Sequence, residues 1–188
     1  IVIPGIVDLA AHLREPGQEH KASIASETQA AAARGITTLC QPANTEPPID
    51  SPATVELIKR LTATGSGVRV VTLGALTAGL KGRQLSDMAA LKQAGCVGVS
   101  NGLQPLADTT TMRRAMEYAD SHGLTVFLHP LDHALTHGGC IHEGAIATRL
   151  GLPGIPTAAE TAAIGQSLAL IEQTGVRTHF CRISTARG

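Results

Sequence analysis

Six short apolar stretches alternate with segments of helical character along the whole chain, and this alternation restricts the fold more than any other feature. The stretches are typical of buried strands, and no two-residue turn joins one stretch directly to the next. Strands separated by helices pair in parallel through right-handed crossovers. The expected strands cover residues 1–13, 36–41, 68–76, 96–100, 124–128 and 176–183.

Helix signals between these strands support the alternation. Ser23 and Ser51 stand at N-cap positions, and Pro52 occupies a favoured first helical position. Thr157 and Glu160 have the spacing of a capping box. Glycines close most of the helices, including the Gly-Ser-Gly at 65–67. The expected helices cover residues 23–34, 51–64, 86–94, 109–122 and 157–174, with loops at 42–50, 77–85 and 130–155.

Two α/β architectures fit this order: an open, doubly wound sheet and six units of a (β/α)₈ barrel. A dinucleotide-binding sheet needs a glycine fingerprint after its first strand, and the chain has none. Polar residues follow every expected strand, and in a barrel they converge on one mouth. We therefore predict a partial TIM barrel forming one domain over 1–188, with two further units beyond Gly188. The polar residues are His12, Arg14, Asn44, Thr77, Asn101, His129 and Arg182.

Composition excludes several classes of function. The formal net charge is zero and aromatic residues make up 2% of the chain, which argues against binding to nucleic acid or anionic membranes. No apolar run approaches the roughly 18 residues of a membrane span. Cys40, Cys96, Cys140 and Cys181 are widely spaced, so we expect reduced cysteines in a cytoplasmic protein.

Four motifs resemble those of the dihydroorotases. Residues 7–17, VDLAAHLREPG, are similar to that family's opening, in which His-x-His precedes Leu-Arg-Glu-Pro-Gly. Residues 42–50 resemble its Asn-Thr-x-Pro motif, residues 143–160 its segment after strand five, and residues 179–185 its His-x-x-His-x-Ser-Thr strand. The resemblance implies a metal-dependent amidohydrolase barrel of pyrimidine biosynthesis that interconverts carbamoyl-aspartate and dihydroorotate. It also implies zinc at the mouth, which activates a hydroxide.

The ligand positions of that family can be compared with this chain one by one. His12 and His129 stand at the second position of the strand-one pair and at the strand-five position. Ala10 stands where the family has His, and Arg182 also stands where it has His. Asn101 stands where the family has Asp or, in related hydrolases, a modified Lys. The strand-eight Asp that acts as general acid and base would lie beyond the chain. Zinc is therefore expected to be absent or weakly bound here.

The positions that contact substrate in that family match this chain better than the metal-ligand positions do. By resemblance, Arg14 and Asn44 contact the substrate carboxylate, and a bidentate guanidinium suits that group. Arg14 could instead pair with Glu15 or Asp8, and Asn44 could serve only the turn. Arg182 carries a fixed charge that opposes a metal, or it could replace the metal's charge in an anion site.

Three functional hypotheses follow. The first is a catalytically inactive dihydroorotase-like protein that assembles with aspartate transcarbamoylase in an oligomer, as noncatalytic chains of the family do. The second is an active cyclic-amide hydrolase with a reduced metal site, and the third is a binding module for small anions through Arg14 and Arg182. His133, His137 and His142 are interpreted as surface residues of the long loop.

Overall fold

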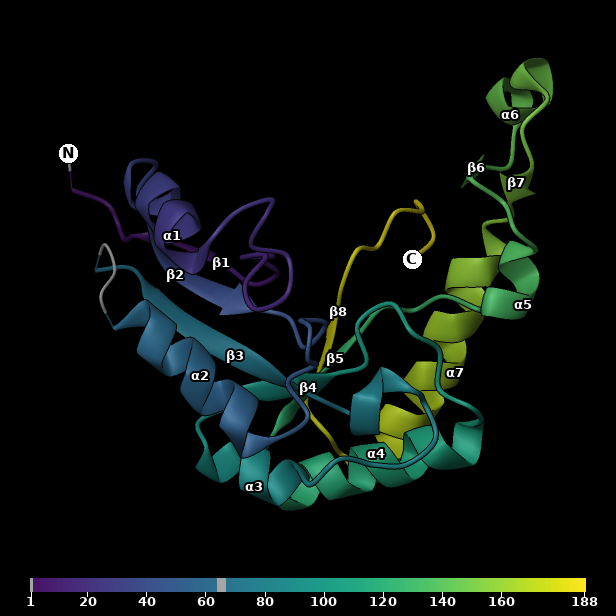
Figure 1. Cartoon of the computed structure of the whole chain (residues 1–188). Coiled ribbons are helices and arrows are strands. Elements are labelled where there is room, and N and C mark those ends of the chain that lie inside the picture. The colour runs from purple at the N-terminus through teal and green to yellow at the C-terminus, as the bar shows by residue number, and fades with distance from the viewer. Residues whose placement is uncertain (1, 64–66) are drawn as a thin grey trace.

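The structure is a computed structural model, and it describes residues 2–63 and 67–188. Strands and helices alternate as the sequence predicts (Figure 1). The main sheet contains β1 (Ile6–Asp8), β2 (Ile36–Gln41), β3 (Arg69–Ala75), β4 (Gly98–Ser100), β5 (Thr125–Leu128) and β8 (Thr178–Phe180). The main helices are α1 (Ile24–Ala32), α2 (Pro52–Thr62), α3 (Met88–Gln93), α4 (Thr109–Ser121) and α7 (Ala158–Thr174).

The six strands form one parallel sheet whose spatial order is also the chain order, β1-β2-β3-β4-β5-β8. A doubly wound sheet would reverse direction at a switch point, so this order excludes it. The sheet curls, with the helices on its outer side (Figure 1). The prediction of a partial (β/α)₈ barrel is therefore confirmed.

Side chains on the two faces of the sheet pack differently. Leu39 of β2 packs outward in a cluster with Ile24 of α1 and Ile58 of α2. The next residue, Cys40, belongs to the inner cluster with Phe127 of β5. Successive residues of a strand point to opposite faces, so the outer face anchors the helices and the inner face fills the barrel.

The first strand is shorter than the predicted 1–13. The ladder with β2 ends at Asp8, whose carboxylate accepts a 2.9 Å hydrogen bond from the backbone of Ala10 and turns the chain. β1 is an edge of the sheet, and Ile6 and Val7 are about half exposed, at 53% and 55%. The last strand is also shorter than the predicted 176–183, because pairing with β5 stops at Phe180.

The capping predictions have mixed outcomes. Ser23 caps α1, forming a capping box with Ser26, and Pro52 begins α2. The predicted box at α7 is wrong: Thr157 has a helical backbone (φ −52°, ψ −31°) and makes no side-chain cap, and the Glu160 carboxylate binds a distant segment. The predicted helix end at 64–67 lies mostly outside the described residues. The predicted helix at 86–94 begins later, with Asp87 as its cap.

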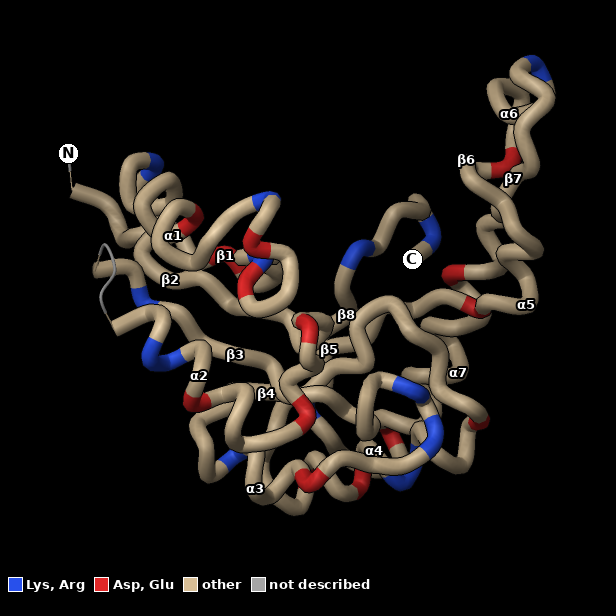
Figure 2. The backbone as a smooth tube through the Cα atoms, in the orientation of Figure 1, with Lys and Arg blue, Asp and Glu red and all other residues tan. Residues whose placement is uncertain are grey.

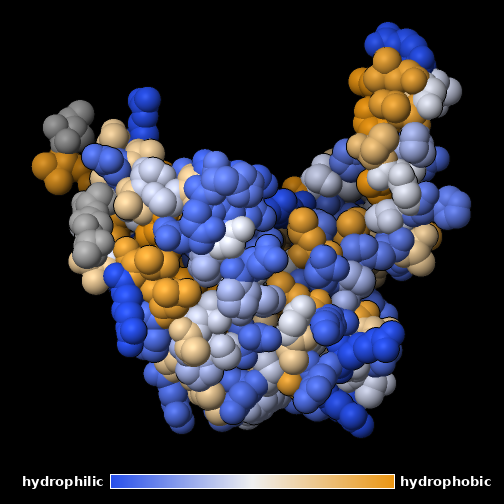
Figure 3. Space-filling model, viewed as in Figure 1, coloured by the Kyte–Doolittle hydropathy of each residue, from blue (hydrophilic) through white to orange (hydrophobic). Residues whose placement is uncertain are grey.

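Two predicted loops contain regular structure. The 77–85 loop holds the 3₁₀ turn η1 (Ala78–Leu80). The 130–155 loop holds short elements that form an arm standing away from the barrel (Figure 1). Apolar side chains are exposed along this arm (Figure 3). The elements of the arm are α5 (His133–Thr136), β6 (Ile141–His142), α6 (Ala145–Leu150) and β7 (Gly154–Ile155).

Candidate functional site at the barrel mouth

Four of the five family ligand positions lie together at the carboxyl ends of the strands. A small cavity of about 40 Å³ is lined by Ala10, His12, His129 and Arg182, among others. A larger cavity of about 360 Å³ adjoins it, because both cavities are lined by His12, Pro42 and Asn44. Lys and Arg positions occur in the loops after β1 and after β8, and those after β1 alternate with acidic positions (Figure 2).

His12 is engaged by Arg182 across the mouth. An Nη atom of Arg182 lies 3.2 Å from Nε2 of His12. A guanidinium can only donate, so this imidazole nitrogen accepts the hydrogen bond and its lone pair is occupied. Burial, together with the charges of Arg182 and Arg14, lowers the pKa of His12, and Asp8 opposes this in part. His12 is therefore held as a neutral acceptor.

His129 follows β5 and has an unused nitrogen. Its Nδ1 is buried and has no hydrogen-bond partner among the described residues. Burial, Arg182 and His133 lower its pKa, against a smaller opposing effect of Glu160. A neutral imidazole with a free buried nitrogen can accept a hydrogen bond or coordinate a metal.

Asn101 has a structural role in the loop after β4. Its Oδ1 accepts a 2.6 Å hydrogen bond from the Thr77 hydroxyl, and its Nδ2 donates to the carbonyl oxygen of Gln104 at 3.0 Å. The side chain is buried and does not line the cavity that His12 and Arg182 share. Its polar atoms tie two loops together, and the residue lines a separate cavity of about 510 Å³ that also includes His129.

Arg14 and Asn44 both line the larger cavity. Arg14 has a left-handed backbone, with φ of 67°, and approaches Gln18 at 3.4 Å. Among residues 2–63 and 67–188 no ion pair joins it to Asp8 or Glu15. Glu15 instead accepts a 2.7 Å hydrogen bond from the backbone of Ile24. The role of Arg14 and Asn44 as carboxylate contacts remains a prediction.

Gln41 is a residue of this cavity that sequence reasoning missed. It ends β2, is 2% exposed and lines the larger cavity. Its Nε2 donates to the carbonyl oxygen of Glu15 at 3.1 Å, and its Oε1 has no partner among the described residues. The available signal was a glutamine at the end of a strand that was expected to be buried, because buried glutamines are uncommon.

Glu160 supports the segment that carries Arg182, and this role was also missed. Its carboxylate accepts hydrogen bonds from the backbone and hydroxyl groups of Ser184 and Thr185, with backbone distances of 2.7 Å and 2.9 Å. Burial raises the pKa of Glu160, and the four hydrogen bonds outweigh it and lower the pKa to about 2. We call Glu160, Ser184 and Thr185 the carboxylate clamp. It secures the loop just after Arg182, which has a left-handed φ of 59°.

The residues at the mouth do not fit a metal ion. Within the described chain, no three His, Cys, Asp or Glu side chains lie together in a metal-binding arrangement. A catalytic zinc site needs three protein ligands. Here His129 offers one free nitrogen, Nε2 of His12 is occupied by Arg182, and Ala10 has no ligand atom.

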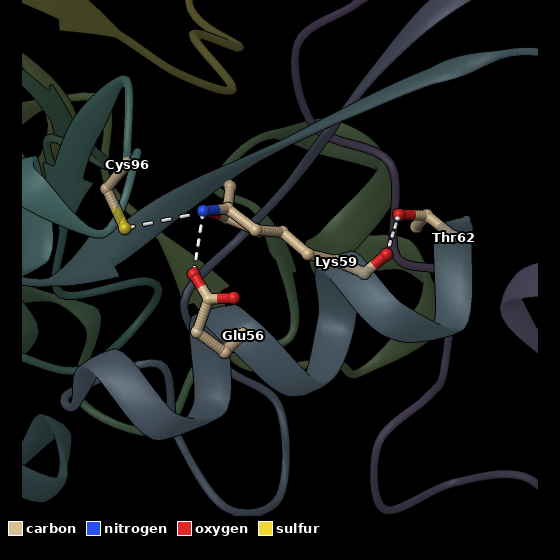
Figure 4. A network of polar contacts seen from close by, with 5 residues as sticks. Glu56, Lys59, Thr62 and Cys96 are labelled. Atoms are coloured by element: carbon tan, nitrogen blue, oxygen red, sulfur yellow. Dashed lines mark hydrogen bonds and ion pairs between the residues drawn. The ribbon is translucent and has the colours of Figure 1, made fainter.

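Of the other cysteines and histidines, Cys181 lines the small cavity beside Arg182, and His133 lines a separate cavity of about 510 Å³ together with His129. His133, His137 and His142 belong to the arm. All four cysteines are free; Cys40 and Cys96 are buried, whereas Cys140 is exposed. Lys59 reaches from α2 toward Cys96 on the outer side of the sheet, and pairs with Glu56 at 2.7 Å (Figure 4). Burial raises the pKa of Cys96 despite its contacts with Thr72 and Lys59, so this thiol is not an activated nucleophile.

Comparison with known proteins matches the whole chain to one family. The model of the family described as "Dihydro-orotase-like" covers residues 1–187. A "Dihydroorotase-like protein" of Pseudomonas putida is 48% identical over 188 residues, which are 100% of this chain and 44% of that protein. A "Dihydroorotase" of Anaeromyxobacter sp. (strain K) is 44% identical over 98% of this chain and 43% of its own length. The chain thus spans less than half of these relatives.

Solved structures support the fold. The L-hydantoinase (dihydropyrimidinase) of Arthrobacter aurescens has a TM-score of 0.74 at 19% identity, over 93% of this chain and 40% of that one. A Saccharomyces cerevisiae dihydroorotase complexed with 5-fluoroorotic acid has a TM-score of 0.59 at 18% identity, over 95% and 48%. None of the helices in the described residues is long and apolar enough to cross a membrane.

Proposed function

This chain belongs to the dihydroorotase-like family, and on that premise we propose that it is a catalytically inactive member with a structural role. The proposed role is assembly with aspartate transcarbamoylase in pyrimidine biosynthesis. A fold can outlast its chemistry, because function depends on the site and not on the barrel alone.

The state of the five ligand positions carries the proposal of inactivity. Ala10 has no ligand atom, Asn101 is bound to neighbouring loops, and Arg182 is a cation. His12 presents its Nε2 to Arg182, and His129 retains a buried Nδ1 with no partner in the described chain. One imidazole is too few for a catalytic zinc.

Electrostatics add to the loss of ligands. Arg182 does not deprotonate in proteins, so it keeps its charge at the mouth. At about 4 Å and an effective dielectric of about 20, one positive charge repels a dication by about 8 kcal/mol before relaxation. A repulsion of that size is comparable with the binding free energy of many metal sites, and it opposes metal binding beside His12.

The arm supports a role in assembly. Ile146, Leu150 and Leu152 are 60%, 57% and 42% exposed, and they belong to one short projecting segment. Exposed apolar side chains gathered on one element favour an interaction surface. The arm stands clear of the barrel, where a partner could reach it (Figures 1 and 3).

Metal content and turnover test the inactivity. The full-length protein should bind no stoichiometric zinc and should not cyclise carbamoyl-aspartate. Zinc at one equivalent or more per chain, together with turnover, would establish the alternative, a hydrolase with a reduced site built on the free nitrogen of His129. A variant with Ala10→His, Asn101→Asp and Arg182→His should gain zinc affinity. Ala10→His alone should not, because Arg182 remains.

Co-purification tests the assembly role. The full-length protein should elute with aspartate transcarbamoylase, and an Ile146→Ser/Leu150→Ser variant should elute separately. Leu168→Ser is the matched control, because Leu168 is 51% exposed on α7 and outside the arm. If the unchanged protein elutes alone in the presence of the partner enzyme, the assembly role is wrong.

A further inference from the structure

We propose that a cavity beside the barrel mouth is a binding site for a small organic amine with an apolar body, such as an arylalkylamine. We call it the side cavity, and the loops after β4 and β5 and helix α7 form its walls. The proposal goes beyond the structural role, because assembly with a partner does not require a ligand in this cavity.

The side cavity is large enough for a small molecule and lies next to the mouth. Its volume is about 510 Å³, within the range of ordinary ligand pockets. Its walls are residues 101–109, residues 127–134 and part of α7, which packs against α4 (Figure 1). Phe127 and His129 border both this cavity and the small cavity of the mouth, whereas Arg182 lines only the mouth.

Apolar side chains from several elements line the side cavity. Leu76 after β3 and Leu128 of β5 are buried, and Met112 of α4 packs against the same hydrophobic cluster. Phe127 adds an aromatic ring, and both rings and thioethers make favourable contacts with an aromatic ligand. The apolar body of a ligand would therefore be removed from water here, which favours binding.

Hydrogen bonds hold the walls in place and use the neutral polar groups of the side cavity. Gln166 of α7 donates from Nε2 to the hydroxyl of Thr109 at 3.0 Å. The hydroxyl of Ser167 donates to the carbonyl oxygen of Ala163 at 2.7 Å, and the amide of Asn101 is used in tying two loops together. A site preformed in this way binds with a smaller loss of conformational freedom. The charged groups, and not these neutral ones, therefore select the ligand.

Two carboxylates make the side cavity negative. Asp108 and Asp132 line it, and none of the residues that line it in the described chain is Lys or Arg. Within residues 2–63 and 67–188, neither carboxylate forms an ion pair. Asp108 accepts a hydrogen bond from the backbone of Thr111 at 2.7 Å, and Asp132 accepts one from the backbone of Ala134 at 2.9 Å. These donors are neutral groups, so both carboxylates keep a negative charge that can attract a cation.

Charge complementarity favours an organic cation as the occupant. Asp108 is exposed and Asp132 is half-buried, so the carboxylates stand at the rim, above the buried apolar lining. An anion would be repelled by both carboxylates. A metal ion is disfavoured, because no three His, Cys, Asp or Glu side chains of the described chain are arranged to bind one. An amine attached to one apolar ring matches both the negative rim and the apolar lining.

Calorimetric titration of the full-length protein tests the site, at about pH 8, where an alkylamine is charged and histidine is neutral. Phenethylamine should bind. Phenethyl alcohol has the same body without the charge, and it should bind at least about threefold more weakly. Hydrocinnamate, which carries the opposite charge, and ethylamine, which lacks the ring, should not bind.

Variants locate the ligand in the side cavity. Asp132→Asn should weaken phenethylamine binding by about threefold, and Asp108→Asn with Asp132→Asn by about tenfold. Binding of phenethyl alcohol should stay the same, because Asn is also a good N-cap and keeps the helix starts. Asp87→Asn is the matched control, since Asp87 caps α3 outside the cavity, and it should change the affinity by less than about twofold. Ala163→Phe should fill the cavity and abolish binding of both compounds.

Three results would overturn the proposal: no binding of phenethylamine, equal affinity for its alcohol, or unchanged affinity in the double Asn variant. Unchanged affinity in a folded Ala163→Phe protein would also refute it, because the ligand would then lie elsewhere. Circular dichroism verifies that each variant is folded. If Ala163→Phe fails to fold, the Asn variants decide. Co-purification with a partner enzyme is a separate readout, so either proposal can fail alone.

Discussion

The barrel mouth and the carboxylate clamp share the segment after β8. Their polar side chains differ greatly in how many hydrogen bonds they make. In the clamp, Glu160 accepts four hydrogen bonds from Ser184 and Thr185. At the mouth, the Arg182 guanidinium makes one hydrogen bond within the described chain, to His12, and Nδ1 of His129 makes none. The hydrogen bonds that hold the loop are therefore complete, whereas the set of metal ligands at the mouth is incomplete.

This difference shows which constraints act on a barrel of this kind. A loop that crosses the mouth must satisfy its backbone groups whatever chemistry it carries, because unpaired buried groups are costly. Ligand side chains matter only when a metal is bound. The clamp should therefore be important for stability, whereas the mouth should contribute little to it.

The largest effect is expected from Glu160→Ala. It removes a buried carboxylate and leaves the backbone N–H groups of Ser184 and Thr185 without their acceptor. The expected loss in the free energy of unfolding is about 3 kcal/mol or more. Urea unfolding measures it. Glu172→Ala on the exposed side of α7 is the control and should stay within about 0.5 kcal/mol. Equal losses in the two variants would show that the clamp is not special.

The main features of the fold were predictable from local pattern. Alternating apolar strands and capped helices determined the parallel order, and Ser23 and Pro52 marked real helix starts. The clamp was not predictable, because Glu160 stands three residues after Thr157 and matches a capping box equally well. Tertiary contact with Ser184 and Thr185, 24 and 25 residues away, decides between the two roles.

Acid should weaken the clamp by neutralising the same carboxylate, with a smaller effect than its removal. The pKa of Glu160 is lowered from 4.5 to about 2 in the folded state. On acidification the unfolded chain therefore binds the proton first. The stabilisation is complete above about pH 4.5 and is lost as the pH falls toward about 2. Urea unfolding across this range should show a steeper decline in stability for the protein than for Glu160→Gln.

A single hydroxyl of the clamp should have a moderate effect. Thr185→Val keeps the shape of the side chain and removes one hydrogen bond to the carboxylate. The expected loss is about 1.5 kcal/mol, typical of a hydrogen bond to a charged group. Thr161→Val is the matched control, because its hydroxyl donates at 3.3 Å to a backbone carbonyl on an exposed turn. If Thr185→Val loses no more free energy of unfolding than Thr161→Val, the clamp stabilises the fold through its backbone hydrogen bonds alone.

The mouth was predictable in position but not in contacts. The motifs place His12, His129 and Arg182 at strand ends, and parallel strands bring those ends together. They do not show that Arg182 donates to His12, because that contact depends on the left-handed backbone at Arg182 and on the course of two loops. The unpaired Oε1 of Gln41 depends likewise on where the Glu15 carbonyl lies.

The smallest effect is expected from Arg182→Met, only two residues before the clamp. Met keeps an unbranched side chain of similar reach and removes the charge and the contact with His12. Arg182 is exposed, and the free energy of unfolding should change by no more than about 0.5 kcal/mol in urea. A small effect here and a large effect for Glu160→Ala would show that the clamp stabilises the fold and that the Arg182 side chain does not. A loss above about 1.5 kcal/mol would instead make the pair with His12 part of the framework, and the contrast between mouth and clamp would fail.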